Sequence, residues 1–307
     1  MRRPATVPLL RLGLRLLRRA GPALPAPCAA VVDRAARLSL SPPEQAAEAA
    51  IDALRQRLAA SDDAVEVVDF GAGTRGGRRP PLRLVRDVYR RAATGPAWGR
   101  FLFGLARAQR PRRVLELGTN LGVGSAHLAA ALALTEAESL PRTRSGGGLS
   151  GRLVTLEGAP ALAALAAENL RALGHTVGPE PGARVRVEVG PFSETLGPVA
   201  EAEGPFDLIF IDGHHEEAAA LAYVRALGPH LAPGALVVLD DVEPGRPVRR
   251  AWARLRALHP RAPALWAGRY GLLFSPPAGP TGGAPAPLVR ESPPAPSEPA
   301  APRAAGR

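Results

Sequence analysis

Lysine is absent from this 307-residue sequence, whose 39 basic residues are all arginine, and cysteine occurs once, at Cys28. A single cysteine excludes an internal disulfide, so a reducing cytoplasm is the expected compartment. The sequence also lacks any run of about 18 apolar residues, and a transmembrane segment is therefore not predicted. The absence of lysine accompanies 34 prolines and 33 glycines. This bias is typical of GC-rich coding and is not interpreted as a functional signal.

The net charge of +11 is concentrated at the N-terminal end. Residues 1–34 carry seven arginines and one acid, Asp33, whereas the remainder of the chain is only mildly basic. A phosphate-binding surface is not required by this distribution, so nucleic acid is not an expected partner. The arginine- and leucine-rich start allows three interpretations: a transit peptide, an amphipathic helix lying on a surface, or a basic arm.

Apolar runs of strand length alternate with helical stretches from residue 113 to residue 275. This alternation predicts a mostly parallel sheet covered by helices on both faces. Two final strand candidates joined by a turn at Gly268 predict a C-terminal antiparallel hairpin, which makes the expected sheet seven-stranded. The predicted strands are 113–117, 152–156, 184–189, 206–211, 235–239, 263–267 and 270–275, and the predicted helices between and after them are 122–135, 159–173, 214–228 and 247–258.

We divide the chain into four parts on composition and pattern. The expected parts are a basic N-terminal arm (1–40), a helical region with a Gly/Arg loop (41–110), the core domain (111–275) and a Pro/Ala-rich tail expected to be disordered (276–307). Within the second part we expect helices at 43–60, 82–93 and 97–109 and a short strand at 64–68, with Ser41 available to cap the first helix.

A strand, a glycine turn and a helix follow one another in VLELGTNLGVGSAHLAAAL, residues 114–132. Glu116 is near the end of the strand, and Gly118 would allow the backbone to turn sharply and approach a ligand closely. The helix that follows offers free N–H groups at its N-terminus. Beyond the next strand, Glu157 occupies a position where a carboxylate can bind both ribose hydroxyls. Together these features predict a site for a nucleoside-containing cofactor.

The residues around the glycines distinguish between two such cofactors. A dinucleotide fingerprint needs G-x-G-x-x-G, but His127 stands where the third glycine after Gly122 and Gly124 would be. A carboxylate two residues before Gly118 suits an ammonium group and would repel a diphosphate. Glu116 therefore favours S-adenosylmethionine (SAM) over a nicotinamide dinucleotide.

A second glycine-rich segment, VVDFGAGTRGG at 67–77, places Asp69 two residues before Gly71. The segment RRPP follows it, and its two prolines prevent the helix that a cofactor loop requires. Two interpretations remain open: a flexible loop near the active site, and a plain surface turn.

The chain resembles the class I methyltransferases, and more closely the catechol and caffeoyl-CoA type O-methyltransferases, over residues 82–275. The similarity is carried by TGPAWGRFLFGLARAQRPRRVLELGTNLGVGSAHLA, VTLEG, VEVGPFSETL, IDGHH and VVLDDVEPG. It implies a Rossmann-like fold and SAM as methyl donor. The implied cofactor-binding residues are Glu116, Gly118, Thr119, Asn120, Gly122, Ser125, Glu157, Gly158, Phe192, Ser193 and Asp212.

The same resemblance implies a candidate magnesium site and a candidate general base. Metal-dependent members hold Mg²⁺ with an Asp after the fourth strand and an Asp-Asn pair after the fifth; here the matching positions are Asp212, Asp240 and Asp241. His215 stands where those members have a lysine base, and Asp212 is a second catalytic candidate. Carboxylate oxygens suit Mg²⁺, and imidazole can accept a proton near neutral pH. Because Asp241 replaces Asn and His215 replaces Lys, two other readings stay open: Asp212 lining the SAM site without metal, and the histidines beginning the next helix.

Three functional hypotheses follow. The first is O-methylation of a small hydroxylated metabolite, with Mg²⁺ as a candidate cofactor. The second is an RNA or protein methyltransferase that docks through the arginine-rich arm. The third is a non-catalytic module that binds SAM or NAD. A homo-oligomer is compatible with all three.

Overall fold

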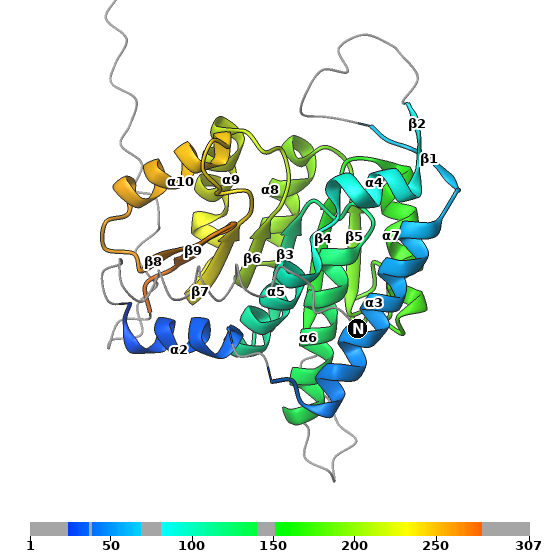
Figure 1. Ribbon diagram of the computed structural model, residues 1–307. Helices are drawn as coiled ribbons and strands as arrows, with labels where there is room; N and C mark the ends of the chain where they lie inside the picture. Colours follow the sequence, from blue (N-terminus) through cyan, green and yellow to red (C-terminus); the bar gives the residue numbers. More distant parts are fainter. Residues whose placement is uncertain (1–23, 37–38, 69–80, 140–150, 278–307) are drawn as a thin grey trace, which may run out of the picture.

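The computed structural model describes residues 24–36, 39–68, 81–139 and 151–277 (Figure 1). The expectations for the basic start of the chain, most of the Gly/Arg loop and the C-terminal tail fall outside these residues. Among the helices of the described part, none is long and apolar enough to cross a membrane.

Seven strands form one mixed sheet in the order β5-β4-β3-β6-β7-β9-β8 (Figure 1). The first five of these run parallel, while β9 pairs antiparallel with both β7 and β8. This confirms the predicted seven-stranded, mostly parallel Rossmann-like sheet with its C-terminal hairpin. The strands are β3 (Arg113–Leu117), β4 (Arg152–Glu157), β5 (Val185–Val189), β6 (Phe206–Ile211), β7 (Leu231–Leu239), β8 (Ala264–Ala267) and β9 (Tyr270–Phe274).

Alternate residues of each central strand belong to two different cores, because successive side chains of a strand point to opposite faces. Val114 packs with the helices on one face of the sheet, and Leu115 packs with those on the other. The first face is covered by α2 (Ala26–Ala35), α3 (Pro42–Ala60), α5 (Pro96–Gln109) and α6 (Val123–Ser139), and the second by α8 (Phe192–Glu203), α9 (Glu217–Leu227) and α10 (Pro247–Leu258). Both faces being covered explains the continuous apolar strand sequences.

A third, smaller core closes one corner of the molecule. It joins α3 to the hairpin of β1 (Ala64–Glu66) and β2 (Leu82–Leu84), and to α4 (Val85–Ala92) and α7 (Pro160–Ala172). Figure 1 shows this hairpin beside α4 and α7, beyond the edge of the sheet that β5 forms.

The first helix of the second region begins where the sequence predicts. The Ser41 hydroxyl and backbone N–H both donate to the Glu44 carboxylate, and the two residues form a capping box. Two segments differ from prediction. Residues 82–84 pair with β1 as a strand instead of starting a helix. The helix predicted at 214–228 begins only at Glu217, as α9, and His214 before it has a φ of +46°, which is not helical.

Candidate functional site

The carboxyl ends of β3, β4, β6 and β7 bring acidic side chains to one edge of the sheet. β3 lies between β4 and β6, so the chain reverses its direction of travel across the sheet at this point. Ligands of open α/β sheets bind in the crevice at such a switch point. Glu116, Glu157, Asp212 and Asp240 lie at or just beyond these strand ends, which makes this edge the candidate site.

Gly118 forms the turn after β3 in a conformation that suits glycine. Its φ is +102°, and a Cβ at this position would lie 2.1 Å from the backbone oxygen of Asp212. Gly122, with φ +79°, also has positive φ and packs against Ala166 of α7. The predicted sharp turn is therefore present, and it lets the loop after β3 lie directly against the end of β6.

The Glu116 side chain is fully buried and only partly hydrogen-bonded. Its Oε2 accepts hydrogen bonds from the hydroxyls of Ser125 and Thr155, the latter at 2.7 Å. Its Oε1 has no hydrogen-bond partner among the described residues. Burial raises the pKa of this carboxyl to about 7, against the lowering effect of the two hydroxyls. A buried carboxylate oxygen without a partner fits an ammonium group, which would satisfy both its charge and its lone pairs.

Glu157 is held in place by backbone donors. The N–H of Asn120 donates to Oε2 at 2.7 Å and the N–H of Ala159 donates to Oε1 at 2.9 Å. Burial raises the pKa of Glu157, while the backbone N–H groups, including that of Gly158, lower it. Asn120 adopts φ +51° to present its N–H to this carboxylate. The two loops after β3 and β4 are thus tied together through Glu157.

Ser125 contacts the buried Glu116 carboxylate directly, and Thr119 does so through Thr155. The Thr119 hydroxyl lies 2.6 Å from the Thr155 hydroxyl, which in turn donates to Glu116. Both Thr119 and Ser125 are buried. Their placement beside Glu116 agrees with the implied cofactor pocket, and direct contact with a cofactor stays a prediction.

The loops after β6 and β7 place two of the three predicted aspartates, Asp212 and Asp241, beside His215. His215 Nδ1 lies 3.2 Å from Asp241 Oδ2, and its Nε2 lies 3.9 Å from Asp212 Oδ1. The imidazole therefore faces the acidic group. Burial and the neighbouring Asp240 carboxylate raise the pKa of Asp212 well above its ordinary value.

A cation that the sequence analysis missed already occupies this group. The guanidinium of Arg269, in the turn before β9, binds Asp240 in bidentate fashion: Nε donates to Oδ1 and Nη2 donates to Oδ2 at 2.6 Å. Its Nη2 also lies 3.2 Å from Asp241 Oδ1, an ion-pair contact. Both Asp240 oxygens already bind a guanidinium, and the charge of Arg269 disfavours a second cation such as the implied Mg²⁺ at this carboxylate. No group of three or more acidic, histidine or cysteine side chains in the described residues has the arrangement of a metal site.

The comparisons with known proteins agree with this geometry. The family described as "Methyltransferase domain" matches residues 115–242, which run from β3 to the residue after Asp241. These residues form a methyltransferase domain. The match confirms the resemblance to class I SAM-dependent methyltransferases, and its span contains all of the candidate cofactor residues and all three aspartates.

Two relatives of the methyltransferase domain are catechol O-methyltransferases. The one from Mycobacterium tuberculosis is 38% identical over 152 residues, which are 50% of this chain and 58% of that protein. The one from Niastella koreensis is 32% identical over 151 residues, 49% of this chain and 58% of that protein. The chain thus spans less than two thirds of either relative. Among solved structures, an O-methyltransferase from Bacillus cereus in complex with SAH is 25% identical over 59% of this chain and 80% of that one, with a TM-score of 0.45.

Phe192, one of the implied cofactor-binding residues, begins α8 of the methyltransferase domain and lies within an aromatic group. Its ring lies edge-on to those of His214 and Tyr223, at centroid distances of 5.3 and 5.7 Å. His214 Nδ1 and the Tyr223 hydroxyl are hydrogen-bonded to each other. Ser193 is exposed beside this group. Sequence reasoning missed Tyr223, which lies in the second turn of α9 (Glu217–Leu227) and has no local sequence signal.

A buried polar network connects the site of the methyltransferase domain to helices α3 and α6. The Thr94 hydroxyl lies 3.5 Å from Asp212 Oδ2, and the backbone oxygen of Thr94 accepts a hydrogen bond from Arg55 Nη1 at 2.6 Å. Arg55 Nη2 lies 3.1 Å from Nε2 of His127, whose Nδ1 lies 3.0 Å from Glu48 Oε1. His127, which stands at the third glycine position of the dinucleotide pattern, thus joins α6 to α3. Burial lowers its pKa.

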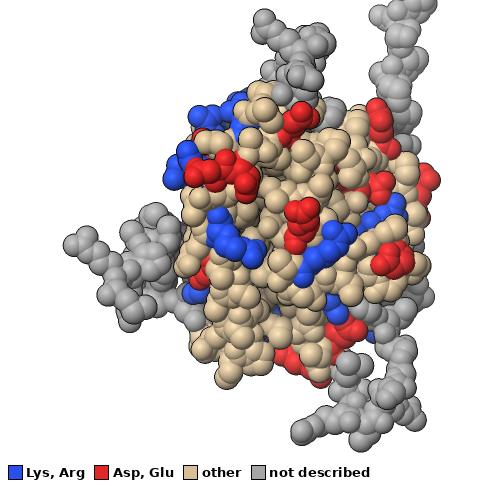
Figure 2. Space-filling view, turned by 90° about the vertical axis from the view of Figure 1, so that its right-hand side faces the viewer, with Lys and Arg blue, Asp and Glu red and all other residues tan. Residues whose placement is uncertain are grey.

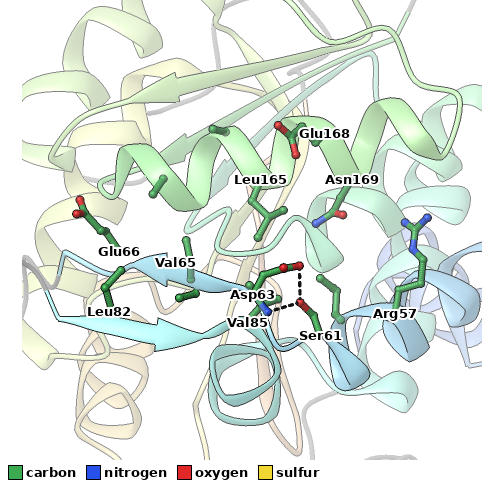
Figure 3. A pocket seen from close by; sticks show the side chains of 14 residues that line it. Arg57, Ser61, Asp63, Val65, Glu66, Leu82, Val85, Leu165, Glu168 and Asn169 are labelled. Carbon is green, nitrogen blue, oxygen red and sulfur yellow. Dashed lines mark hydrogen bonds between the residues drawn. The ribbon is translucent and has the colours of Figure 1, made fainter.

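A pocket of about 700 Å³ lies away from these residues, between the β1–β2 hairpin and α7 (Figure 3). Leu82 and Leu165 contribute apolar side chains, while Asp63 and Glu168 contribute charge (Figure 3). None of the predicted cofactor, base or metal residues lines it. The pocket is separate from the candidate active site.

Proposed function

We propose that this chain is a SAM-dependent O-methyltransferase that acts on a small hydroxylated, catechol-like acceptor. The observation that carries the proposal is the buried Glu116 Oε1, which has no hydrogen-bond partner in the described part of the chain and lies near the Gly118 turn of a methyltransferase domain. The catechol O-methyltransferase names of the two relatives support the acceptor class.

The charges at the two strand ends favour SAM over a dinucleotide. The ammonium of SAM would pair with Glu116 Oε1, and the ribose hydroxyls would bind the Glu157 carboxylate, whose orientation the Asn120 and Ala159 amides fix. A diphosphate placed here would meet two carboxylates, which disfavours NAD. When bound, SAM supplies the methyl group that the acceptor oxygen takes.

On the acceptor side, His215 is the candidate general base. Its side chain is about half exposed, at 46%, so a substrate hydroxyl can reach it. Once the imidazole has accepted the hydroxyl proton, the nearby Asp241 carboxylate stabilises the resulting imidazolium. Asp212, next to Gly118, lies between the proposed donor and acceptor sites.

The alternatives are less well supported by the described residues. On the face shown in Figure 2, arginines and acidic residues are interspersed among uncharged side chains without a broad positive patch. Such a surface does not favour nucleic acid. The arginine-rich arm itself lies outside the described residues.

Calorimetric titration of SAM and of NAD into the full chain tests the cofactor directly. We expect SAM to bind and NAD not to compete. Glu116→Gln should weaken SAM binding by about tenfold or more because it removes the charge partner of the ammonium. The matched control Glu201→Gln changes an exposed carboxylate on α8 and should bind normally. Preference for NAD, or unchanged affinity in Glu116→Gln, would overturn the proposal.

A further inference from the structure

We propose that Arg269 is a built-in cation for the Asp240–Asp241 pair, and that this chain therefore methylates its acceptor without a divalent metal. The replacement of a metal by Arg269 is inferred from the geometry alone, whereas metal-free methylation rests on the proposed function. Arg269 is a positioning residue here, since it contacts the two aspartates.

The first support is the completeness of the pairing. Both oxygens of Asp240 accept hydrogen bonds from the guanidinium fork, and the Asp240 side chain is fully buried. A guanidinium remains charged at all physiological pH values and matches a carboxylate in this two-point geometry. A divalent ion would have to remove these bonds and would then lie beside a displaced positive charge. Both effects oppose metal binding.

The second support is that the backbone places Arg269 in this position. The pairing of β7 with β9 sets Leu239 opposite Gly271, so the turn containing Arg269 lies beside Asp240 and Asp241. The N–H of Val242 donates to the Arg269 backbone oxygen at 2.8 Å, which ties the turn to the loop after β7. The contact is thus built into the sheet register and does not depend on a side-chain rotamer alone.

The third support is the environment of the remaining ligand candidates. Asp241 Oδ2 faces His215 Nδ1, and Asp212 Oδ2 faces the Thr94 hydroxyl. Both Asp240 oxygens already accept hydrogen bonds from Arg269, and a metal would also have to share Asp241 and Asp212 with their existing neighbours. This leaves His215 as the group that removes the acceptor proton, without a metal ion to lower the hydroxyl pKa.

Direct metal binding is the sharpest test. Mn²⁺ added to the full-length protein should show no bound fraction by electron paramagnetic resonance at concentrations that saturate a typical carboxylate site. Arg269→Ala frees Asp240 and should strengthen Mn²⁺ binding by about tenfold or more. Asp240→Asn in the Arg269→Ala background should remove that gain. Arg256→Ala, which removes an exposed arginine on α10, is the matched control and should behave as the unaltered protein.

Turnover of the unaltered protein gives a second readout that needs no variant. We expect the same rate with a chelator as with added Mg²⁺. Stoichiometric Mn²⁺ bound by the unaltered protein, or activity lost in chelator and restored by Mg²⁺, would overturn the inference, even if Arg269→Ala fails to fold. Absence of SAM binding would instead contradict the proposed function, and the Mn²⁺-binding experiment would still test the role of Arg269.

Discussion

Gly118 and Asp212 are in direct backbone contact across the switch point of the sheet: a Cβ on Gly118 would lie 2.1 Å from the Asp212 oxygen. This closeness joins the loop after β3, which carries the proposed donor site, to the strand end that carries the acidic group. The positions of the donor site and of the acidic group therefore both depend on the absence of a side chain at Gly118.

Gly118→Ala should move the loop and damage the donor site. The added methyl group overlaps backbone, and the positive φ strains any other residue, so we expect a loss of about 2–3 kcal/mol in the free energy of unfolding. SAM affinity should fall by about tenfold or more, because Glu116 and the loop shift together. Urea unfolding and calorimetry measure the two effects. Gly182→Ala is the control, because a Cβ there has no atom within 4 Å. Normal SAM affinity in Gly118→Ala would contradict this account of the loop.

Glu116 should make the stability of the ligand-free protein depend on pH. Burial raises its pKa to about 7 in the folded state. A raised carboxyl pKa contributes stability that is fully present below the unfolded value of about 4.3. This stability, about 4 kcal/mol here, is lost as the pH rises through about 7. Between pH 5 and 8, the unaltered protein should therefore lose more free energy of unfolding than Glu116→Gln does. Parallel pH profiles for the two proteins would show that the carboxyl is not titrating in this range.

SAM should reverse that pH effect. Pairing with the ammonium favours the ionised Glu116, so SAM binding near pH 6 should release a proton that binding near pH 9 does not. Calorimetry in two buffers of different ionisation enthalpy measures the number of protons released. Equal proton release at both pH values would count against an ammonium–Glu116 pair.

His215→Asn should slow methyl transfer without weakening SAM binding. Loss of a general base lowers kcat by about 10²–10⁴-fold, while the Glu116 and Glu157 contacts are untouched. His230→Asn is a suitable control because His230 precedes β7 at the opposite edge of the sheet. Added imidazole should partly restore the His215→Asn rate. Full activity in His215→Asn would assign proton removal to another group.

His127→Leu should destabilise the fold. The substitution leaves buried Glu48 and Arg55 without one of their partners, which costs about 2–4 kcal/mol in the free energy of unfolding. Chemical denaturation of the single variants and of the double variant with Glu48→Gln gives the coupling energy. Independent, additive effects would mean that these side chains do not act as a network.

The sheet was predictable because its strands are buried on both faces and read as continuous apolar runs. Helix α8 was not predicted, because Gly197 and Pro198 lie within it and both disfavour helix. Helix α2 was not predicted, because its short sequence follows the arginine-rich start and has few large apolar residues; Val32 and Ala35 of that helix are nevertheless buried in the core.

The candidate donor site was predicted from sequence because Glu116, Gly118 and Glu157 lie at or just beyond the ends of strands that read as apolar runs. Arg269 could not be assigned to Asp240 by spacing, because their contact depends on the register between β7 and β9. The predicted hairpin did contain the relevant clue. Its turn falls at the carboxyl edge of the sheet, and the one arginine in Gly268-Arg269-Tyr270 is the residue that reaches the aspartates.

Methyl transfer itself is the most direct test of the central claim. The full chain would be incubated with SAM and a panel of small catechols, and mass spectrometry would follow both S-adenosylhomocysteine and the acceptor. We predict equal amounts of S-adenosylhomocysteine and singly methylated acceptor, with the added methyl group on oxygen. Bound SAM with no methylated acceptor, or a methyl group transferred to RNA or protein instead, would contradict the assignment as a small-molecule O-methyltransferase.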